Sequence, residues 1–345
     1  MHPRTRYALA AAAATTLVAC APSPQGLVPP GTPNATAPTR WKAVMPGHGA
    51  SWMARGLAQR DLLYVSNNNG TVNVYRYWQR TLVGVLTNFQ RPMGECSDWS
   101  GNVYITDYNA KKIYVYAHGG TKAVRAIDDS PYRPKGCAVS PKGDLAVANY
   151  GTEYSSYFGD GNIAVWTHAT GTPAYYADNN DNHFTSCAYD NHGDLLATTL
   201  SGYSGIWYYS TEFYYVPKGS SKAISMNLPN PYSSSGWDYS QVQAMGFDGK
   251  YWVVDSYGSL LRYTINIQAT FVDLILLKGT DGVGAVALYR KTLKTPATQA
   301  AGDSNSYNSK YAVDFFKYPA GGDPSGTITK DLDAPSGLAI SLRSK

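Results

Sequence analysis

The chain has 345 residues, of which 43% are apolar and only 15% are charged, against a typical charged share of about 25%. Its formal charge of +5 comes from scattered Lys and Arg with no run beyond Lys111-Lys112, which excludes the electrostatic footprint of a nucleic-acid-binding protein. The 29 Tyr residues, together with abundant Asn, Ser and Gly, suit an extracytoplasmic all-β protein whose loops are polar and aromatic.

The N-terminus has the layout of a secretory signal peptide. Arg4 and Arg6 precede an apolar stretch from Ala8 to Val18, which is too short to span a bilayer. We therefore expect residues 1–19 to be removed from the mature protein.

The end of this leader, Leu17-Val18-Ala19-Cys20, resembles the lipobox of bacterial lipoproteins. The resemblance implies that Cys20 becomes the lipidated first residue and that its acyl chains hold the protein on a membrane. The alternative is an ordinary secretory signal with a chance Cys. Ala21 follows, and the lack of Asp there resembles lipoproteins sent to the outer membrane of a host with two membranes. The predicted location is the bacterial cell envelope, with the chain lipid-anchored at the outer membrane, in the periplasm or on the cell surface.

A flexible tether follows the leader. Residues 20–45 are rich in Pro, Ala, Thr and Gly, have no periodicity and offer little to bury. We expect this segment to hold a domain of residues 46–345 away from the membrane.

One pattern recurs along the remainder of the chain. Its clearest copy joins Pro92-Met93-Gly94, Gly101-Asn102-Val103-Tyr104-Ile105 and Ile113-Tyr114-Val115-Tyr116. A second copy begins at Pro134-Lys135-Gly136. Repeats of roughly 40–50 residues with several short strands are typical of a β-propeller. Although 345 residues could form two average domains, the repeat favours one large closed domain.

Each repeat divides into four strands, which we name A to D. The strand following Pro-x-Gly is A, and D is a short run such as Ala123–Ala126. Strand B is predicted at Leu63–Val65, Val103–Ile105, Leu145–Val147, Leu195–Ala197, Tyr251–Val253 and, weakly, Ala297–Gln299. Strand C is predicted at Val72–Tyr75, Ile113–Tyr116, Ile163–Trp166, Phe213–Val216, Leu260–Tyr263 and Ala312–Phe315. The predicted fold is an all-β, six-bladed propeller with four-stranded blades.

The two ends of the repeat region complement each other. The first blade has B, C and D from about Leu62 but lacks a preceding A, and the chain ends with an unaccompanied A strand at Pro335–Ile340. We expect the C-terminal strand to join the N-terminal blade and close the ring, which leaves no free sheet edge.

The motif that begins at Pro92 and ends at Tyr116 resembles an NHL repeat. The resemblance covers roughly residues 60–342, clearly in blades two and three and loosely in the later ones. It implies a six-bladed propeller of the NHL and gluconolactonase-like kind, similar to a group of secreted bacterial proteins without an assigned role. The motif residues are mainly structural and imply no particular activity.

The length of the connections distinguishes the two faces of such a ring. The predicted C–D turns are short, whereas residues 151–160 and 302–310 (B–C) and 177–183 and 228–240 (D–A) are long. In an up-and-down blade these four connections share one face, so we predict that this face binds a ligand. Its candidate binding residues, some of which could instead pack their own loops, are Tyr154, Tyr157, Phe158, His183, Tyr232, Trp237, Asp238 and Tyr307.

Metal sites are only weakly indicated. The run from Asp178 to His183 is rich in oxygen donors but does not match an EF-hand, and Asx residues also favour plain turns. Gluconolactonase-like propellers hold a divalent metal in the central channel. At the equivalent position this chain has Leu338, Glu95, Cys137, Cys187 and Gln243, of which only Glu95 and Gln243 could bind a hard cation. Asp178, Asp181 and Glu95 remain weak metal candidates; no cofactor is otherwise expected.

The cysteines other than Cys20 lie near the start of three A strands. Cys137 and Cys187 are equivalent, and Cys96 is offset by one residue. An oxidising compartment permits disulfides, but we expect neighbouring inner strands to be more than about 7 Å apart, which favours buried free thiols.

These features favour a monomeric envelope lipoprotein that binds a protein or glycan through its loop-rich face. A metal-dependent lactonase or hydrolase, or a lyase, acting at the channel is the alternative, and a purely structural envelope component is a third. The departure from the gluconolactonase metal set makes an enzyme the less favoured hypothesis.

Overall fold

A computed structural model describes most of the chain after the predicted tether. The described residues are 49–152, 160–176, 182–202, 209–229, 231, 242, 244–256, 258–280, 284–305 and 311–343. Within them the fold is all-β, with a single 3₁₀ turn, η1 (Thr167–Ala169). Nothing helical in this part of the chain is long and apolar enough to cross a bilayer.

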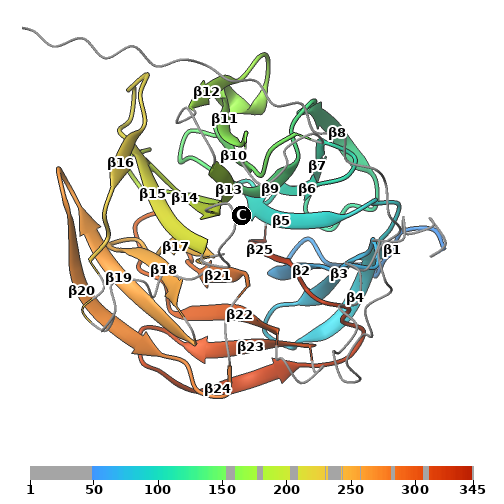
Figure 1. The fold of residues 1–345 in the computed structure, drawn as a ribbon. Coiled ribbons are helices and arrows are strands. Elements are labelled where there is room, and N and C mark those ends of the chain that lie inside the picture. The colour runs from blue at the N-terminus through green and yellow to red at the C-terminus, as the bar shows by residue number, and fades with distance from the viewer. Residues whose placement is uncertain are drawn as a thin grey trace, which may run out of the picture. The chain divides into compact units, whose positions relative to one another are not determined.

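The strands form antiparallel sheets arranged as a β-propeller (Figure 1). One sheet contains β1 (Trp52–Met53), β4 (Thr81–Leu86), β3 (Val72–Arg76), β2 (Leu62–Ser66) and β25 (Gly337–Ser341). The next contains β5 (Pro92–Ser97), β6 (Val103–Asp107), β7 (Lys112–Tyr116) and β8 (Ala123–Asp128). A third contains β9 (Pro134–Val139), β10 (Leu145–Asn149), β11 (Asn162–Trp166) and β12 (Ala174–Tyr176).

The later repeats give sheets of the same order. One contains β13 (Asn182–Tyr189), β14 (Leu195–Gly202), β15 (Tyr209–Val216) and β16 (Ile224–Met226). Another contains β17 (Met245–Phe247), β18 (Trp252–Ser256), β19 (Ser259–Ile265) and β20 (Ala269–Leu276). The last contains β21 (Val286–Tyr289), β22 (Gln299–Asn305), β23 (Tyr311–Lys317) and β24 (Gly321–Ile328). Five of the sheets have four strands, and the sheet joining the two ends has five because β1 pairs outside β4.

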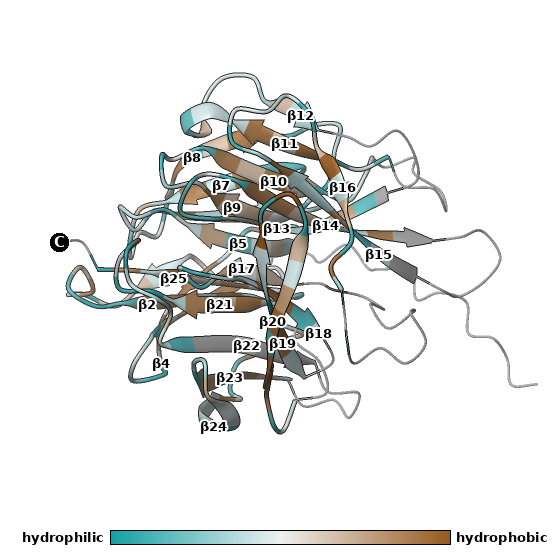
Figure 2. Ribbon diagram, turned by 90° about the vertical axis from the view of Figure 1, so that its left-hand side faces the viewer, coloured by the Kyte–Doolittle hydropathy of each residue, from teal (hydrophilic) through white to brown (hydrophobic). Residues whose placement is uncertain are grey.

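The A strands form the inner wall of the ring. Contacts between neighbours run from β25 to β5, β9, β13, β17 and β21 and return to β25. Apolar residues concentrate along the strands, whereas hydrophilic residues occupy many of the turns (Figure 2). The core is therefore a series of apolar layers between neighbouring sheets.

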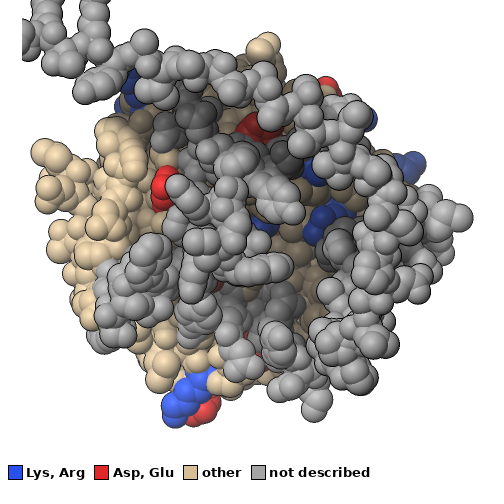
Figure 3. Space-filling view, in the orientation of Figure 1, with Lys and Arg blue, Asp and Glu red and all other residues tan. Residues whose placement is uncertain are grey.

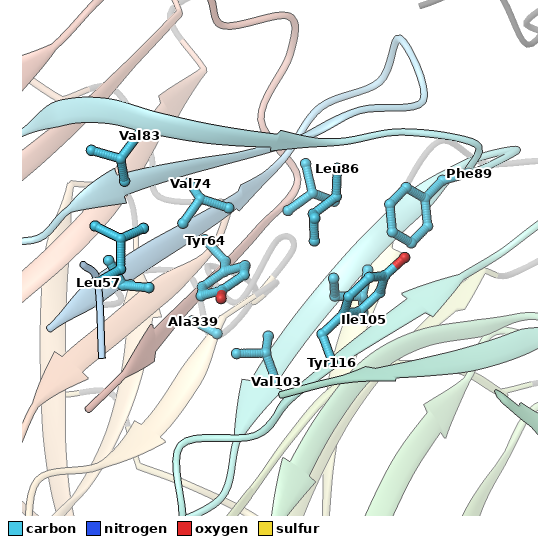
Figure 4. Packing of buried hydrophobic residues seen from close by; sticks show 12 residues of the cluster. Leu57, Tyr64, Val74, Val83, Leu86, Phe89, Val103, Ile105, Tyr116 and Ala339 are labelled. Carbon is cyan, nitrogen blue, oxygen red and sulfur yellow. The ribbon is translucent and has the colours of Figure 1, made fainter. Parts of the chain in front are cut away.

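The closure predicted from the chain ends is confirmed. Strand β25 pairs antiparallel with β2, from Leu62↔Ser341 to Ser66↔Gly337. Ala339 packs into the apolar layer on one side of the sheet, where Tyr64 and Val103 meet (Figure 4), and Leu338 packs into the layer on the other side. The C-terminal strand thus belongs to two apolar layers at once.

The A–B turns explain why the motif repeats. Asp98 Oδ1 accepts hydrogen bonds from the backbone N–H groups of Ser100 and Asn102, both at 2.9 Å. Asp190 Oδ1 does the same for its own turn, including the N–H of Asp194 at 2.9 Å. Gly101 has φ +88°, a left-handed conformation that favours glycine. These residues are structural, as the resemblance implied.

Two faces of the ring are used below. The upper face carries the B–C turns and D–A connections, which include residues 87–91, 108–111, 129–133 and 150–152. The lower face carries the A–B and C–D turns, which include residues 77–80, 98–102, 140–144, 190–194 and 290–298. The last described residues, which follow β25, lie on the lower face, at the left of Figure 2.

Several predicted element bounds were wrong. Residues 302–305 belong to β22 and residues 182–183 to β13, because the ends of these strands pair with β23 and β14 instead of entering the loops. Strand β22 begins only at Gln299, so the A–B connection of the last sheet spans residues 290–298. A long connection therefore also exists on the lower face, contrary to the prediction that every long insertion lies on the other face.

Candidate functional site

Most of the predicted site lies outside the described residues. This holds for the lipid attachment residue and for most of the loop and metal candidates: Cys20, Tyr154, Tyr157, Phe158, Asp178, Asp181, Tyr232, Trp237, Asp238 and Tyr307. Gln243 is also outside them. The structure describes His183 and Glu95, and it brings them to different places.

His183 lies in strand β13 on the upper face, not in a loop. Its ring stacks on Tyr150, with the centroids 4.0 Å apart and the planes at 8°. Its Nδ1 lies 2.5 Å from the carbonyl oxygen of Tyr150, so Nδ1 carries the proton and donates it. Burial lowers the pKa of His183, because the charged ring would lose solvation. A neutral imidazole stacked on a phenol is the result.

Cationic side chains surround the two neighbouring Tyr rings of the upper face. Lys135 Nζ lies 5.4 Å from the centroid of the Tyr150 ring. The guanidinium carbons of Arg91 and Arg133 lie 4.9 and 5.4 Å from the Tyr108 centroid. The Tyr108 and Tyr150 rings are themselves 5.9 Å apart. With His183, these five residues form what we call the upper cluster.

The upper cluster places three cationic side chains on this part of the face. Lys and Arg atoms are visible beside the centre of the upper face, over β5 and β9 (Figure 3). Burial and the nearby charge of Arg91 lower the pKa of Lys135 to about 8. A cation on an aromatic ring is stabilised by about 0.5–1 kcal/mol at exposed sites. The arrangement can bind an anionic or aromatic group by charge and stacking.

Backbone hydrogen bonds position the cluster. Asp107, which is fully buried at the end of β6, accepts the N–H of Gln90 at 2.8 Å and that of Arg91 at 2.9 Å. A backbone hydrogen bond also joins Tyr150 to Arg133, since the Tyr150 N–H donates to the Arg133 carbonyl at 2.9 Å. The B–C turns are thereby tied to the D–A connections, and the rings and cations are held in one arrangement.

Glu95 is buried between sheets. Ser66 Oγ, at the end of β2, donates to Glu95 Oε1 at 2.7 Å, and Glu95 Oε2 has no hydrogen-bond partner among the described residues. Burial raises the pKa of Glu95 well above its ordinary value, offset in part by hydrogen bonds from Ser66 and the backbone of Ala339. The described residues contain no group of three His, Cys, Asp or Glu side chains that could hold a metal ion.

The prediction that the cysteines are free thiols was wrong for two of them. Cys96 and Cys137 form a disulfide, with Cα atoms 5.7 Å apart. The inner strands approach this closely because glycines line them: a Cβ on Gly94 would lie 2.8 Å from the Cα of Gly136. Cys187 is buried and free, and burial raises the pKa of its thiol to about 12. The glycine of the Pro-x-Gly motif was the signal from which the close approach of β5 and β9 could have been predicted.

The described geometry defines an all-β propeller with a cationic, aromatic cluster on its upper face. No model of a known protein family matches the sequence, so the NHL resemblance stays a prediction. No curated protein matches it either.

Solved structures do share the fold. A protein of unknown function from Bacteroides caccae is 9% identical, has a TM-score of 0.57, and aligns over 82% of this chain and 99% of its own. A chain of a nidogen–laminin complex is 13% identical, with a TM-score of 0.56, over 83% of this chain and 100% of that one. Kuenenia stuttgartiensis hydrazine synthase is 12% identical, with a TM-score of 0.52, over 80% and 96%. At these identities the similarity is one of fold alone.

Proposed function

We propose that this protein is an envelope lipoprotein, anchored through Cys20, whose propeller is a binding scaffold for a protein or a glycan. The ligand would bind on the upper face. Three kinds of support bear on this proposal: the N-terminal sequence, the disulfide and the upper cluster.

The extracytoplasmic part of the proposal draws on sequence and covalent chemistry. Arg4, Arg6 and the tetrad that ends in Cys20 have the pattern of a lipoprotein leader. Disulfides persist in oxidising compartments and are rare in the cytosol, so the Cys96–Cys137 bond favours export.

The observation that carries the binding part is the upper cluster. Tyr and Arg are enriched at the centres of protein interfaces, because they give large contact area, stacking and directed hydrogen bonds. Here Arg91 and Arg133 pack on Tyr108 beside Tyr150, on a backbone fixed by Asp107. A chain of similar fold takes part in a complex of nidogen and laminin, which is an example of a propeller within a protein–protein complex.

The anchoring is tested by metabolic labelling with an alkyne fatty acid. We expect the full chain to be labelled and to sediment with membranes, and Cys20→Ala to lose both properties. Labelling that persists in Cys20→Ala would contradict the lipid assignment.

The binding face is tested by photo-crosslinking in whole cells. A photoreactive residue at Asn109, an exposed position in the upper-face turn beside Tyr108, is compared with one at the exposed lower-face residue Lys142. We expect a discrete adduct from position 109 that Trp237→Ala with Tyr157→Ala abolishes. Adducts from position 142 alone would place the ligand-binding site on the lower face instead. The metal-dependent lactonase, hydrolase or lyase alternative gains no support from the described residues and is not proposed.

A further inference from the structure

The lower face has a long depression beside the C-terminal strand. It consists of three cavities of about 710, 290 and 170 Å³. Asp61, Tyr289 and Arg343 line both of the first two, and Trp99 and Leu342 line both the first and the third. Because they share walls, we treat the three as one feature, the lower groove.

One wall of the lower groove is the long connection 290–298. It folds around the nearly buried Arg290, whose Nη2 donates to the Leu293 carbonyl at 2.5 Å and to Asn191 Oδ1 at 2.8 Å. The Arg290 Nε donates to the Thr295 carbonyl at 3.3 Å. This wall is thus an ordered part of the fold.

Two indole rings are presented at the lower groove. Trp78 is 46% exposed and Trp99 is 39% exposed, which is unusual for so large an apolar side chain. Trp78 is fixed by a hydrogen bond from its Nε1 to Asp61 Oδ2 at 3.1 Å and by edge contact with Tyr289 at 4.9 Å. Trp99 lies over Arg290, 5.6 Å from the guanidinium carbon to the ring centroid. Both rings are held in place while part of their surface stays open to solvent.

The charge of the lower groove is mainly positive in its first two cavities. Its exposed cations are Arg60, Lys291, Lys294 and Arg343, and none forms an ion pair with a carboxylate of the described residues. Asp61 also lines these two cavities, but its oxygens already accept hydrogen bonds from Trp78, from the Tyr289 hydroxyl at 2.9 Å and from the Arg343 N–H at 3.0 Å. The third cavity is lined by Asp98 and Asp190, which accept N–H groups of their own turns. The first two cavities, with four cations and one carboxylate, therefore complement an anion.

We propose that the lower groove binds an acidic oligosaccharide, such as a run of uronic acid units. The C–H faces of sugar rings pack on exposed indoles, as Trp78 and Trp99 offer, and the sugar carboxylates pair with Lys291, Lys294 and Arg343. A linear polymer fits a row of joined cavities better than a flat membrane surface does, since the cavities are concave. This site lies on the face opposite the upper cluster, so it stands independently of the function proposed above.

The test is direct binding to the purified full chain by titration calorimetry. The probes are an acidic hexamer of galacturonic acid, a heparin hexasaccharide and the neutral cellohexaose. We expect at least one acidic probe to bind, with an affinity that falls as NaCl increases, and cellohexaose to bind at least tenfold more weakly. Trp99→Ala, and separately Lys291→Gln with Lys294→Gln, should each weaken binding at least tenfold.

The matched control is Lys218→Gln with Lys222→Gln, two exposed lysines of a lower-face turn, residues 217–223, that does not line the groove. This variant should stay within twofold of the unmodified chain. Circular dichroism confirms that each variant is folded, and the two lysine substitutions at exposed positions keep the test valid if Trp99→Ala unfolds. The proposal is overturned if neither acidic probe binds, if cellohexaose binds as well as they do, or if poly-glutamate or anionic vesicles bind more tightly.

Discussion

Glu95 is a carboxyl group placed where a charge is poorly solvated. It is 8% exposed, and only Oε1 has a hydrogen-bond partner among the described residues. Its raised pKa means that the folded protein holds the proton more tightly than the unfolded chain does. Between the unfolded pKa of a Glu and the higher folded one, folding takes up a proton, so stability falls as the pH rises.

Glu95→Gln replaces the protonated carboxyl with a neutral amide of the same shape. We predict that this variant loses part of the decline in stability between pH 5 and pH 8, a decline of at most about 1.4 kcal/mol per pH unit for one group. Part of the slope should remain, because burial also raises the pKa of Asp129 to about 8. The measurement is urea unfolding at several pH values.

The control for this variant is Glu212→Gln, at an exposed carboxylate on β15 whose Oε2 accepts the Tyr214 hydroxyl at 2.8 Å. It should leave the slope unchanged. Equal slopes for Glu95→Gln and the unmodified chain would mean that Glu95 is ionised in the folded state.

At the residue scale, the alignment of the repeats predicted well which positions are equivalent. Cys137 faces Val147 and Cys187 faces Ala197 in the same register, and Glu95 faces Ile105. The partner of each side chain could not be predicted that way, because it comes from the neighbouring sheet. Ser66, which hydrogen-bonds Glu95, lies 29 positions away in the chain.

At the scale of elements, the distance between inner strands decides the cysteine chemistry. A Cβ on Gly136 would lie 2.7 Å from the Thr185 carbonyl oxygen, so the β9–β13 approach is as close as that of β5 to β9. Glycine has no Cβ, and its presence in successive A strands brings the backbones together. The predicted spacing of more than about 7 Å ignored this, although the motif contains the glycine in each clear copy.

The Cys96–Cys137 bond joins β5 to β9 across a sequence separation of 41 residues. Closing a loop of that length in the unfolded chain accounts for about 4 kcal/mol in the chain-entropy model. We predict that Cys96→Ala with Cys137→Ala lowers the free energy of unfolding by about this amount, as measured in guanidinium. Added reductant should destabilise the unmodified chain and leave the double variant unaffected.

A thiol count checks the assignment itself. In denaturant without reductant, the thiols of Cys96 and Cys137 should not react, whereas that of Cys187 should. In the folded protein Cys187 should be unreactive as well, because it is buried and its pKa is about 12. Reaction of Cys96 or Cys137 before reduction would contradict the bond.

Connection lengths were a useful but incomplete guide to function. They predicted binding loops on the upper face, and those loops lie mostly outside the described residues. The lower groove escaped that reasoning because Trp78 and Trp99 lie in short turns. The signal was present, since the turn positions equivalent to Trp99 hold Pro141 and Asn191 in other repeats. A residue in a short turn that differs from its equivalents in the other repeats is as good an indication of a specific role as an insertion is.

At the scale of the whole molecule, the ring depends on its last strand. Leu338, Ala339 and Ile340 are 4%, 3% and 8% exposed, and they fill apolar layers on both sides of the closing sheet. Burying each large apolar side chain contributes about 1.5–3 kcal/mol, and whole domains are stable by only about 5–15 kcal/mol. Closure is therefore comparable in size with the entire net stability.

Deleting residues 337–345 should open the propeller. It removes β25, leaves the backbone groups of β2 as a free edge and exposes Tyr64 and Val65, which are fully buried in the closed ring. We predict loss of the cooperative thermal transition and aggregation of the truncated chain. Deletion of residues 344–345 alone is the control, because β25 stays intact.

Strand complementation separates closure from a general loss of chain length. A synthetic peptide of residues 335–343 added to the truncated chain should restore the cooperative transition, since it supplies the five paired positions from Gly337 to Ser341. A peptide with Leu338 and Ile340 replaced by Asp should not, because its backbone can pair while its side chains cannot enter the apolar layer they share. A truncated chain that unfolds cooperatively without any peptide would show that the ring holds without β25, and that the two chain ends need not meet.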